Sequence, residues 1–156
     1  MTKILMVCLG NICRSPLAEG IMRFKIQKRK IDAFVDSAGT SDEHEGEHPD
    51  SRSIQNAKNN GIDISKLRAR QFCIKDFDEF DFIYVMDSSN YDDIISLTKN
   101  DHDKKKVHKI LNMAFPGANR SVPDPYYGGE QGFENVFILL EKACDAIADS
   151  LEKNQR

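Results

Sequence analysis

The strongest constraint on the fold is an alternation between short apolar runs and longer segments with helical spacing. Apolar runs of this length are typical of buried strands, and the segments between them repeat apolar residues at helical intervals. The predicted strands are residues 3–8, 33–37, 82–86 and 107–111, and the predicted helices are residues 15–28, 51–60, 90–98 and 131–151. This order predicts an α/β fold of three layers, in which a four-stranded parallel sheet has helices on both faces.

Composition limits the function classes. The chain has 156 residues, 40% of them hydrophobic, and no repeat or linker divides it, so we expect residues 1–156 to form one domain with a real core. A formal charge of −3 argues against nucleic-acid binding. The apolar run at residues 4–8 is too short for a signal peptide or a membrane span, so we expect a cytoplasmic protein without a membrane partner.

The first predicted helix has a clear start signal, with Ser15 as N-cap and Pro16 at the first helical position. Gly61 follows the second predicted helix, where a left-handed cap is expected. Ligands of parallel sheets bind in the loops at the carboxyl ends of strands. The loop between the first strand and the first helix is therefore a candidate binding site.

That loop, "CLGNICRS" at residues 8–15, has the composition of an anion-binding cradle. The backbone must reverse within a few residues, and Gly10 and Asn11 take a positive φ most readily. The reversal points successive N–H groups inward at a helix N-terminus, which suits phosphate, and Arg14 adds a planar, permanently charged fork. The residues expected to bind phosphate are Leu9, Gly10, Asn11, Ile12, Cys13, Arg14 and Ser15.

Two cysteines lie in this loop, and the spacing distinguishes them. A nucleophile at the floor of the cradle needs the loop to wrap around it and return with Arg14, which fits Cys8 and leaves no room for Cys13. Helix N-termini and nearby cations favour the thiolate, so we expect Cys8 to be ionised at neutral pH. Cys13 can trap an oxidised Cys8 as a disulfide. Cys73 and Cys144 are predicted to be packing residues, since four scattered cysteines do not make a disulfide scaffold.

The loop, with Pro16 after it, resembles the low-molecular-weight protein tyrosine phosphatases. The resemblance runs through "DSAGTS" at 36–41, "RARQ" at 68–71, "VMDSSN" at 85–90 and "DPYYG" at 124–128. It implies the four-stranded fold above and hydrolysis of phosphotyrosine-type esters through a phosphocysteine, without a metal or other cofactor. The implied partners are tyrosine-phosphorylated proteins or peptides and small aryl phosphates, with inorganic phosphate or vanadate as active-site anions.

The resemblance also assigns catalytic roles. Cys8 attacks phosphorus while the loop N–H groups and Arg14 hold the phosphoryl oxygens. The Ser15 hydroxyl donates to the sulfur. Asp124 protonates the leaving oxygen and then activates water, on a loop that Pro125 stiffens.

Further residues are implied to shape the site. Asn11 and Ser37 hold the loop in its strained form, and Ile12, Tyr126 and Tyr127 line the pocket. The loop that contains Glu43 and His44 borders the pocket, but many family members carry an aromatic residue there, so the wall is expected to be incomplete. A second departure is Leu67, where a histidine that helps to hold the loop asparagine is common.

Other interpretations remain open. Asp124 taken alone fits a simple Asp-Pro turn equally well. The stretch "SDEHEGEHPD" at 41–50 permits a metal site, although such a run is usually a solvated loop. Rival functions on this fold are an arsenate reductase, which would need a cysteine pair where only Cys73 stands, and a protein-arginine phosphatase, which tends to carry a small threonine in place of Ile12. A non-catalytic phosphate-binding or redox-sensing module is the alternative from another class, and Asp124 argues against it.

Overall fold

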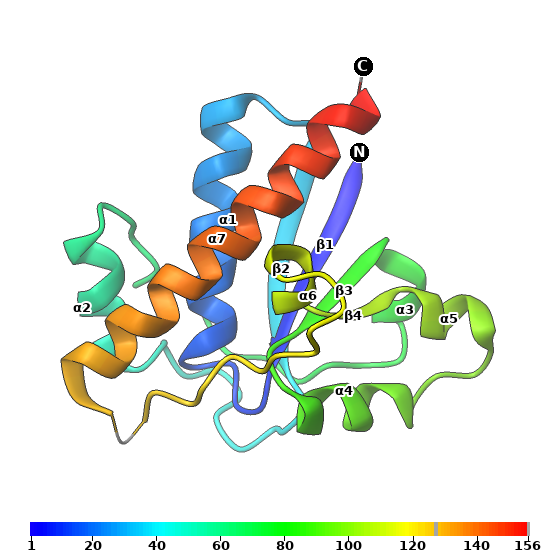
Figure 1. Cartoon of the computed structure of the whole chain (residues 1–156). Coiled ribbons are helices and arrows are strands. Elements are labelled where there is room, and N and C mark those ends of the chain that lie inside the picture. Colours follow the sequence, from blue (N-terminus) through cyan, green and yellow to red (C-terminus); the bar gives the residue numbers. More distant parts are fainter. Residues whose placement is uncertain (127, 156) are drawn as a thin grey trace.

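Four parallel strands form the centre of the molecule. The computed structural model describes residues 1–126 and 128–155, and Figure 1 shows the arrangement of its elements. The strands are β1 (Thr2–Cys8), β2 (Ala33–Gly39), β3 (Phe82–Val85) and β4 (Val107–Lys109). Their order is β2-β1-β3-β4, and each neighbouring pair is parallel. The predicted four-stranded parallel sheet is confirmed.

Helices cover both faces of this sheet. They are α1 (Arg14–Arg29), α2 (Ser51–Asn59), α3 (Asp76–Glu79), α4 (Ser88–Ile95), α5 (Asp101–Lys105), α6 (Leu111–Ala114) and α7 (Gly129–Gln155). Alternate residues of a strand point to opposite faces, and β1 follows this rule: Ile4 and Met6 pack in a core with residues of α1 and α7, whereas Leu5 and Val7 pack in a second core with residues of α3 and α4. The three predicted layers are confirmed, and burial on both faces explains why β1 reads as a continuous apolar run.

The start of α1 differs from the prediction. Cys13, rather than Ser15, occupies the N-cap position, and its side chain makes no capping hydrogen bond. Ser15 is the second helical residue and is fully buried. Its hydroxyl contacts the loop instead of the helix end, because the chain turns into the helix two residues earlier than the serine-proline signal indicates. By contrast, Gly61 takes the expected left-handed conformation after α2, with φ of 79°.

Other boundaries shift for identifiable reasons. β2 continues to Gly39, because Ala38 and Gly39 still pair with Val7 and Cys8 of β1. α4 begins at Ser88, where the Asp87 carboxylate accepts a hydrogen bond from Asn90 N. β4 ends at Lys109, and the last predicted strand residue begins α6. The helices α3, α5 and α6 span only four or five residues, too few for an apolar period to be recognised.

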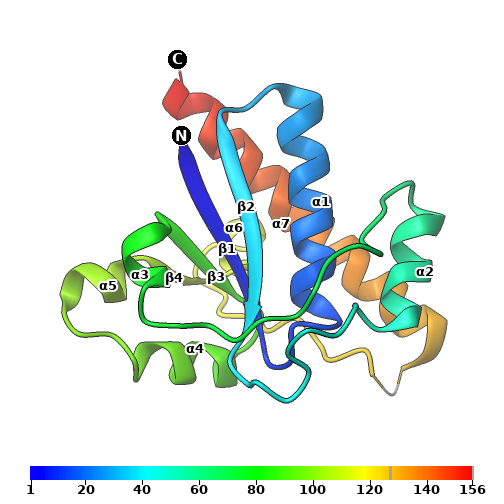
Figure 2. The ribbon, with the colours of Figure 1, turned by 180° about the vertical axis from the view of Figure 1, so that it is seen from behind.

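The carboxyl ends of the strands face away from both chain termini (Figure 1). Seen from behind in Figure 2, the segment between α2 and α3 crosses the carboxyl end of β2. At this end of β2, Gly39 is required by the loop that follows β1, since a Cβ built on it would lie 2.8 Å from the carbonyl oxygen of Leu9. None of the helices in the described part of the chain carries an apolar stretch that could cross a bilayer.

Candidate active site

Asn11 gives the loop of residues 8–15 its shape. Its φ of 57° lies in the left-handed region, whereas Gly10, the other residue expected there, has no positive φ. The Asn11 side chain is fixed from three directions: Nδ2 donates to Ser15 Oγ (2.7 Å) and to Ser37 Oγ (2.9 Å), and Oδ1 accepts from the backbone N of Arg70 (3.0 Å). The loop support predicted for Asn11 and Ser37 thus has a matching geometry, to which Arg70 adds a third anchor.

The carbonyl groups of the loop are held outward. Backbone N–H groups of neighbouring loops donate to three of them, with Thr40 N to Cys8 O at 2.9 Å, Ser41 N to Leu9 O at 2.9 Å and Asp50 N to Ile12 O at 2.7 Å. The Ser53 hydroxyl donates to a fourth, Cys13 O, at 3.3 Å. The carbonyl and the following N–H of a trans peptide point in opposite directions. The N–H groups of residues 9, 10, 13 and 14 therefore turn inward, as an anion site needs.

Cys8 lies at the floor of this ring, at the end of β1 and 3% exposed. Its Sγ is 3.0 Å from Ser15 Oγ and accepts from Asn11 N at 3.3 Å. Asn11 N thus points at the sulfur, and the Ser15 hydroxyl, whose oxygen accepts from Asn11 Nδ2, can donate to it as well. Such donors can stabilise a thiolate or a departing sulfur.

Arg14 is anchored by residues from distant parts of the chain. Its Nη1 donates to Asp87 Oδ2 at 2.8 Å and to Val122 O at 2.9 Å. Nη1 carries two of the five N–H groups of a guanidinium, so this anchoring leaves three for another acceptor. The sequence interpretation missed Asp87, although an acid directly after a parallel strand next to β1 is a signal that could have revealed it.

A hollow of about 130 Å³ opens over the ring. It is lined by Cys8, Leu9, Gly10, Ile12, Cys13, Arg14, Glu43, His44, Asp124 and Tyr126. The structure thus brings the predicted nucleophile, arginine, acid and pocket residues to one place, while Asn11, Ser15 and Ser37 are buried behind them. Tyr127, also predicted to line the pocket, lies outside the described residues.

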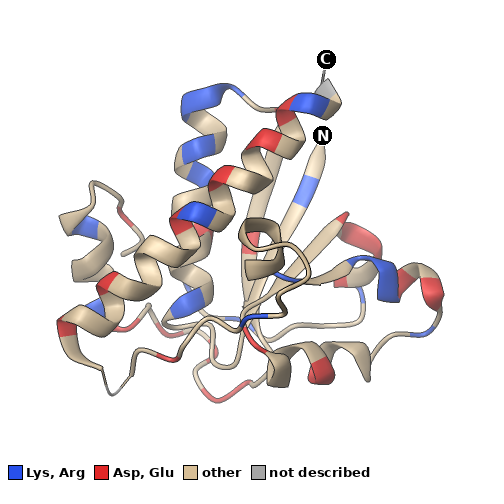
Figure 3. Cartoon of the chain, in the orientation of Figure 1, with Lys and Arg blue, Asp and Glu red and all other residues tan. Residues whose placement is uncertain are grey.

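The loop between β2 and α2 forms one wall of the hollow. The His44 ring lies over Gly10, where an added Cβ would be 3.0 Å from its Cδ2, and its Nδ1 is 2.8 Å from Glu47 Oε2. An imidazole ring therefore occupies part of the wall that was expected to be incomplete. Acidic residues lie along this loop (Figure 3).

The two histidines of this loop contact different partners. His48 Nδ1 is 3.2 Å from the carbonyl oxygen of Leu67, whereas His44 contacts Glu47. Across residues 1–126 and 128–155, no three side chains of His, Cys, Asp or Glu gather as metal ligands would. Replacement of the usual histidine by Leu67 does not leave Asn11 unsupported, because Arg70 N bonds its Oδ1.

Asp124 makes a turn and also lines the hollow. Its Oδ1 accepts from Tyr126 N at 3.0 Å, as an Asx turn requires. Asp124 is exposed and lines the same hollow as Cys8. The turn interpretation and the catalytic one are thus compatible. The guanidinium of Arg52 lies 4.7 Å from the centre of the Tyr126 ring and supports this segment from α2.

The remaining cysteines differ from Cys8. Burial, reinforced by the negative charge of Asp50, raises the pKa of Cys13 to about 12. Cys13 is therefore a neutral thiol at physiological pH, although it lines the same hollow. Cys144 is fully buried on α7, which confirms its predicted packing role. Cys73 is exposed, so the packing role predicted for it is wrong; it lies in the loop before α3, where its backbone N donates to Asp76.

A buried carboxylate behind the ring was not predicted as part of the site. Glu19, on α1 and 2% exposed, accepts from Ser37 Oγ at 2.7 Å and pairs with Arg23. Burial raises the pKa of Glu19, against the opposing effects of Ser37 and Arg23. Hydrogen bonds thus run from Cys8 through Ser15, Asn11 and Ser37 to Glu19. The bond between Glu19 and Ser37 joins α1 to β2, so no local spacing in the sequence indicates it.

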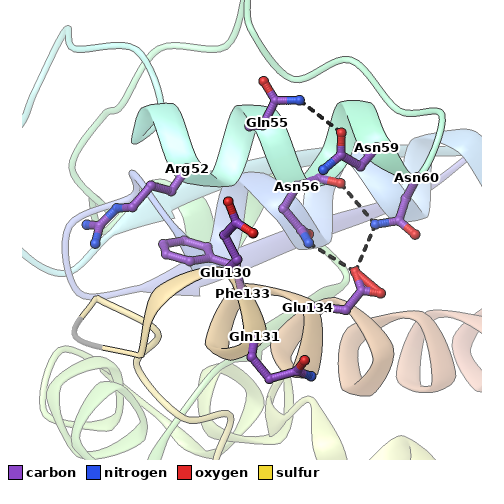
Figure 4. Close-up of a pocket in the computed structure, with 9 residues that line it drawn as sticks. All are labelled: Arg52, Gln55, Asn56, Asn59, Asn60, Glu130, Gln131, Phe133 and Glu134. Carbon is purple, nitrogen blue, oxygen red and sulfur yellow. Dashed lines mark hydrogen bonds between the residues drawn. The ribbon is translucent and has the colours of Figure 1, made fainter.

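A larger hollow of about 420 Å³ lies between α2 and the start of α7 (Figure 4). Its lining consists mainly of amides and acids, with Glu134 accepting from Asn56 (3.0 Å) and Asn60 (3.1 Å). Arg52 lines it as well and contacts Tyr126, so the two hollows share a wall. No cysteine or other strong nucleophile lines it, and the smaller hollow is the better candidate for chemistry.

Comparison with known proteins identifies the family. A family model described as "Low molecular weight phosphotyrosine protein phosphatase" matches residues 3–156. The Schizosaccharomyces pombe low molecular weight phosphotyrosine protein phosphatase is 43% identical over 146 residues, which cover 90% of this chain and 92% of that protein. The Gallus gallus protein with the same description is 37% identical over 148 residues, covering 94% and 93%. A crystal structure of a protein tyrosine phosphatase from Entamoeba histolytica, with Hepes in the active site, matches with a TM-score of 0.92 and 39% identity over 100% of both chains. The chain therefore belongs to the low molecular weight phosphotyrosine protein phosphatase family.

Proposed function

We propose that this protein hydrolyses phosphotyrosine-type monoesters on proteins through a phosphocysteine intermediate. The observation that carries the proposal is the position of Cys8 Sγ at the floor of a ring of inward N–H groups, beside an anchored Arg14 and in the same hollow as Asp124. Membership of the phosphatase family supports it. Small aryl phosphates are the minimal substrates, and inorganic phosphate and vanadate are anions that fit the same ring.

The first step transfers the phosphoryl group to sulfur. The Cys8 thiolate attacks phosphorus, an S–P bond forms, and the bond from phosphorus to the tyrosyl oxygen breaks. Loop N–H groups of residues 9–15 and the guanidinium of Arg14 hold the three equatorial oxygens. Asp124 gives its proton to the departing oxygen, which leaves as a neutral phenol.

The second step returns the enzyme to its starting state. The ionised Asp124 accepts a proton from water as the water oxygen attacks phosphorus, and the S–P bond breaks to release phosphate. The departing sulfur is stabilised by the Ser15 hydroxyl, 3.0 Å away. At the end of the cycle, Cys8 is again a thiolate and Asp124 again carries the proton that it took from water.

The other residues of the site are assigned supporting roles. The bond from Asn11 to Ser37 helps to hold the loop in its shape, in which Asn11 has a left-handed backbone conformation. Ile12, Glu43, His44 and Tyr126 would contact the substrate ring and its flanks, together with Tyr127 by resemblance. Cys13 would protect Cys8 from irreversible oxidation. The bulk of Ile12 favours a flat phenyl ester over phosphoarginine.

The test is turnover of an aryl phosphate, tyrosine phosphopeptides and arginine phosphopeptides by the wild-type protein and by Asp124→Ala. We expect hydrolysis of the first two, and an Asp124→Ala loss on the order of 10² to 10⁴ in kcat for a phenyl-type ester. The loss should be far smaller for an ester whose leaving group is a weak base. Preferential hydrolysis of phosphoarginine would contradict the substrate class, and vanadate binding without any turnover would indicate a non-catalytic module.

A further inference from the structure

Lys109 is a buried lysine at the carboxyl end of β4, only 8% exposed. Its Nζ donates to Ser88 Oγ at 2.8 Å, to Asn119 O at 2.6 Å and to Ser121 Oγ at 3.2 Å. An ammonium group has three N–H donors, and these contacts use all three. The position of the side chain is therefore strongly determined by its surroundings.

The three acceptors belong to the two segments that hold Arg14. Ser88 directly follows Asp87, the carboxylate partner of Arg14. Ser121 directly precedes Val122, whose carbonyl oxygen is the other acceptor of Arg14 and whose N donates to Met86 O at 2.7 Å. Ser88 N also donates to Ser121 Oγ at 3.3 Å. Lys109 thus joins the start of α4 to the segment that leads to Asp124.

The acceptors of Lys109 are two hydroxyls and a peptide carbonyl, all of them uncharged. A buried cation held by neutral oxygens is costly to desolvate. An apolar side chain of similar length can therefore replace such a group without necessarily destabilising the fold. If such a variant of Lys109 remains folded, a change in its activity reports a role of Lys109 in positioning rather than in stability.

We propose that Lys109 is a positioning residue for the acid, fixing the path of residues 119–124 so that the Asp124 carboxyl reaches the leaving oxygen. The proposal rests on the catalytic role of Asp124 proposed above. Pro123 and Pro125 flank Asp124, and proline fixes φ. A displacement at Ser121 is thus passed on to Asp124, because the backbone between them has little freedom to absorb it.

The test compares Lys109→Met with the matched control Lys106→Met. Lys106 also donates from Nζ to a backbone carbonyl, that of Phe77, but it touches neither segment of the site. For phenyl phosphate, we expect Lys109→Met to lower kcat on the order of 10²-fold, the loss typical of a misplaced catalytic group. The loss should be much smaller for nitrophenyl phosphate, whose leaving group needs little protonation. Lys106→Met should leave both kcat values within about twofold of wild type.

Asp124→Ala and the double variant separate the two proposals. If Lys109 acts through the acid, Lys109→Met should cost little further kcat in the Asp124→Ala background. A leaving-group-dependent loss in Asp124→Ala, with none in Lys109→Met, would overturn the Lys109 proposal alone. A kcat loss in Asp124→Ala that does not depend on the leaving group would instead overturn the catalytic role of Asp124, on which the Lys109 proposal rests.

Ser121→Ala is the second variant, for use if Lys109→Met does not fold. It removes one acceptor of the ammonium and the contact with Ser88 N, and Ser121 is exposed, so the fold should tolerate it. The same leaving-group-dependent pattern, of smaller size, is expected. A loss equal for both esters, or no loss at all, would overturn the proposal.

Discussion

The ring around Cys8 and the wall of the hollow are held in different ways. In the ring, Asn11 and Arg14 are at most 4% exposed and bind residues 26 to 108 positions away, among them Ser37 and Val122. In the wall, side chains bond to near neighbours in the sequence, as in Glu43 N to Ser41 Oγ, Tyr126 N to Asp124 Oδ1 and His44 to Glu47. Distant residues hold the backbone of the wall instead, with Gly46 N donating to Ala69 O and Arg52 Nη1 donating to Tyr126 O. The difference teaches that the site for the phosphoryl group is preorganised by the whole fold, whereas the surface for the rest of the substrate can be altered without disturbing it.

The largest effect is expected in the ring, at its nucleophile. Cys8→Ser should abolish turnover of an aryl phosphate while vanadate binding stays measurable, because the N–H groups and Arg14 remain in place. Cys13→Ser should keep a substantial fraction of activity, since a thiol with a pKa of about 12 is not the nucleophile. Steady-state turnover and vanadate titration check both variants, and equal loss in the two would refute the assignment.

Oxidation should remove all activity reversibly. Mild peroxide oxidises Cys8 to the sulfenic acid, which condenses with the Cys13 thiol to a disulfide and releases water. A dithiol should then restore activity, whereas Cys13→Ser should drift to an irreversible sulfinic acid. Peptide mass mapping checks the pairing, and Cys8 joined to Cys73 or Cys144 would contradict it.

Behind the ring, Glu19→Gln should change how stability depends on pH. Burial raises the pKa of Glu19 above its ordinary value of 4.5. Between these two pKa values the folded state binds more protons than the unfolded state, so the contribution of Glu19 to the free energy of unfolding is lost as pH rises through the raised pKa. Glu19→Gln should lack this decline, which denaturant titrations of both proteins at several pH values would reveal. Parallel pH profiles would show that Glu19 does not titrate in this way.

The smallest effect is expected in the wall, from Glu43→Trp. An added ring beside His44 should lower KM for aryl phosphates, equivalent to about 0.5 to 1.5 kcal/mol if it stacks on the substrate, with kcat nearly unchanged. The wild-type protein should also disfavour phosphopeptides with acidic flanks at low salt, because Asp42, Glu43, Glu45 and Glu47 are clustered in this loop. An unchanged KM together with no salt-sensitive preference would mean that the loop does not contact the substrate.

The sequence predicted the parts of the site that lie in one continuous segment or follow a strand directly. Cys8, Arg14 and Asp124 meet in one hollow as expected, since strand ends in a parallel sheet converge. Three contacts were missed because each joins residues far apart in sequence: Asp87 to Arg14, Arg70 N to Asn11, and Lys109 to Ser121. Ser15 was misjudged as the N-cap for a different reason: Asn11 Nδ2 and Cys8 Sγ engage its hydroxyl within the loop, and Cys13 takes the N-cap position.

The anchoring of Arg14 also affects the order in which the site can form. The cradle sequence is synthesised early, but the two acceptors of Arg14 lie 73 and 108 residues later in the chain. Contacts of such sequence separation close late, because the loop entropy is lost before the contact forms. A growing chain that has not reached Val122 therefore carries the cysteine without its anchored arginine. The capacity to handle phosphate thus appears near the end of folding, when the last strand and the segment after it have joined the sheet.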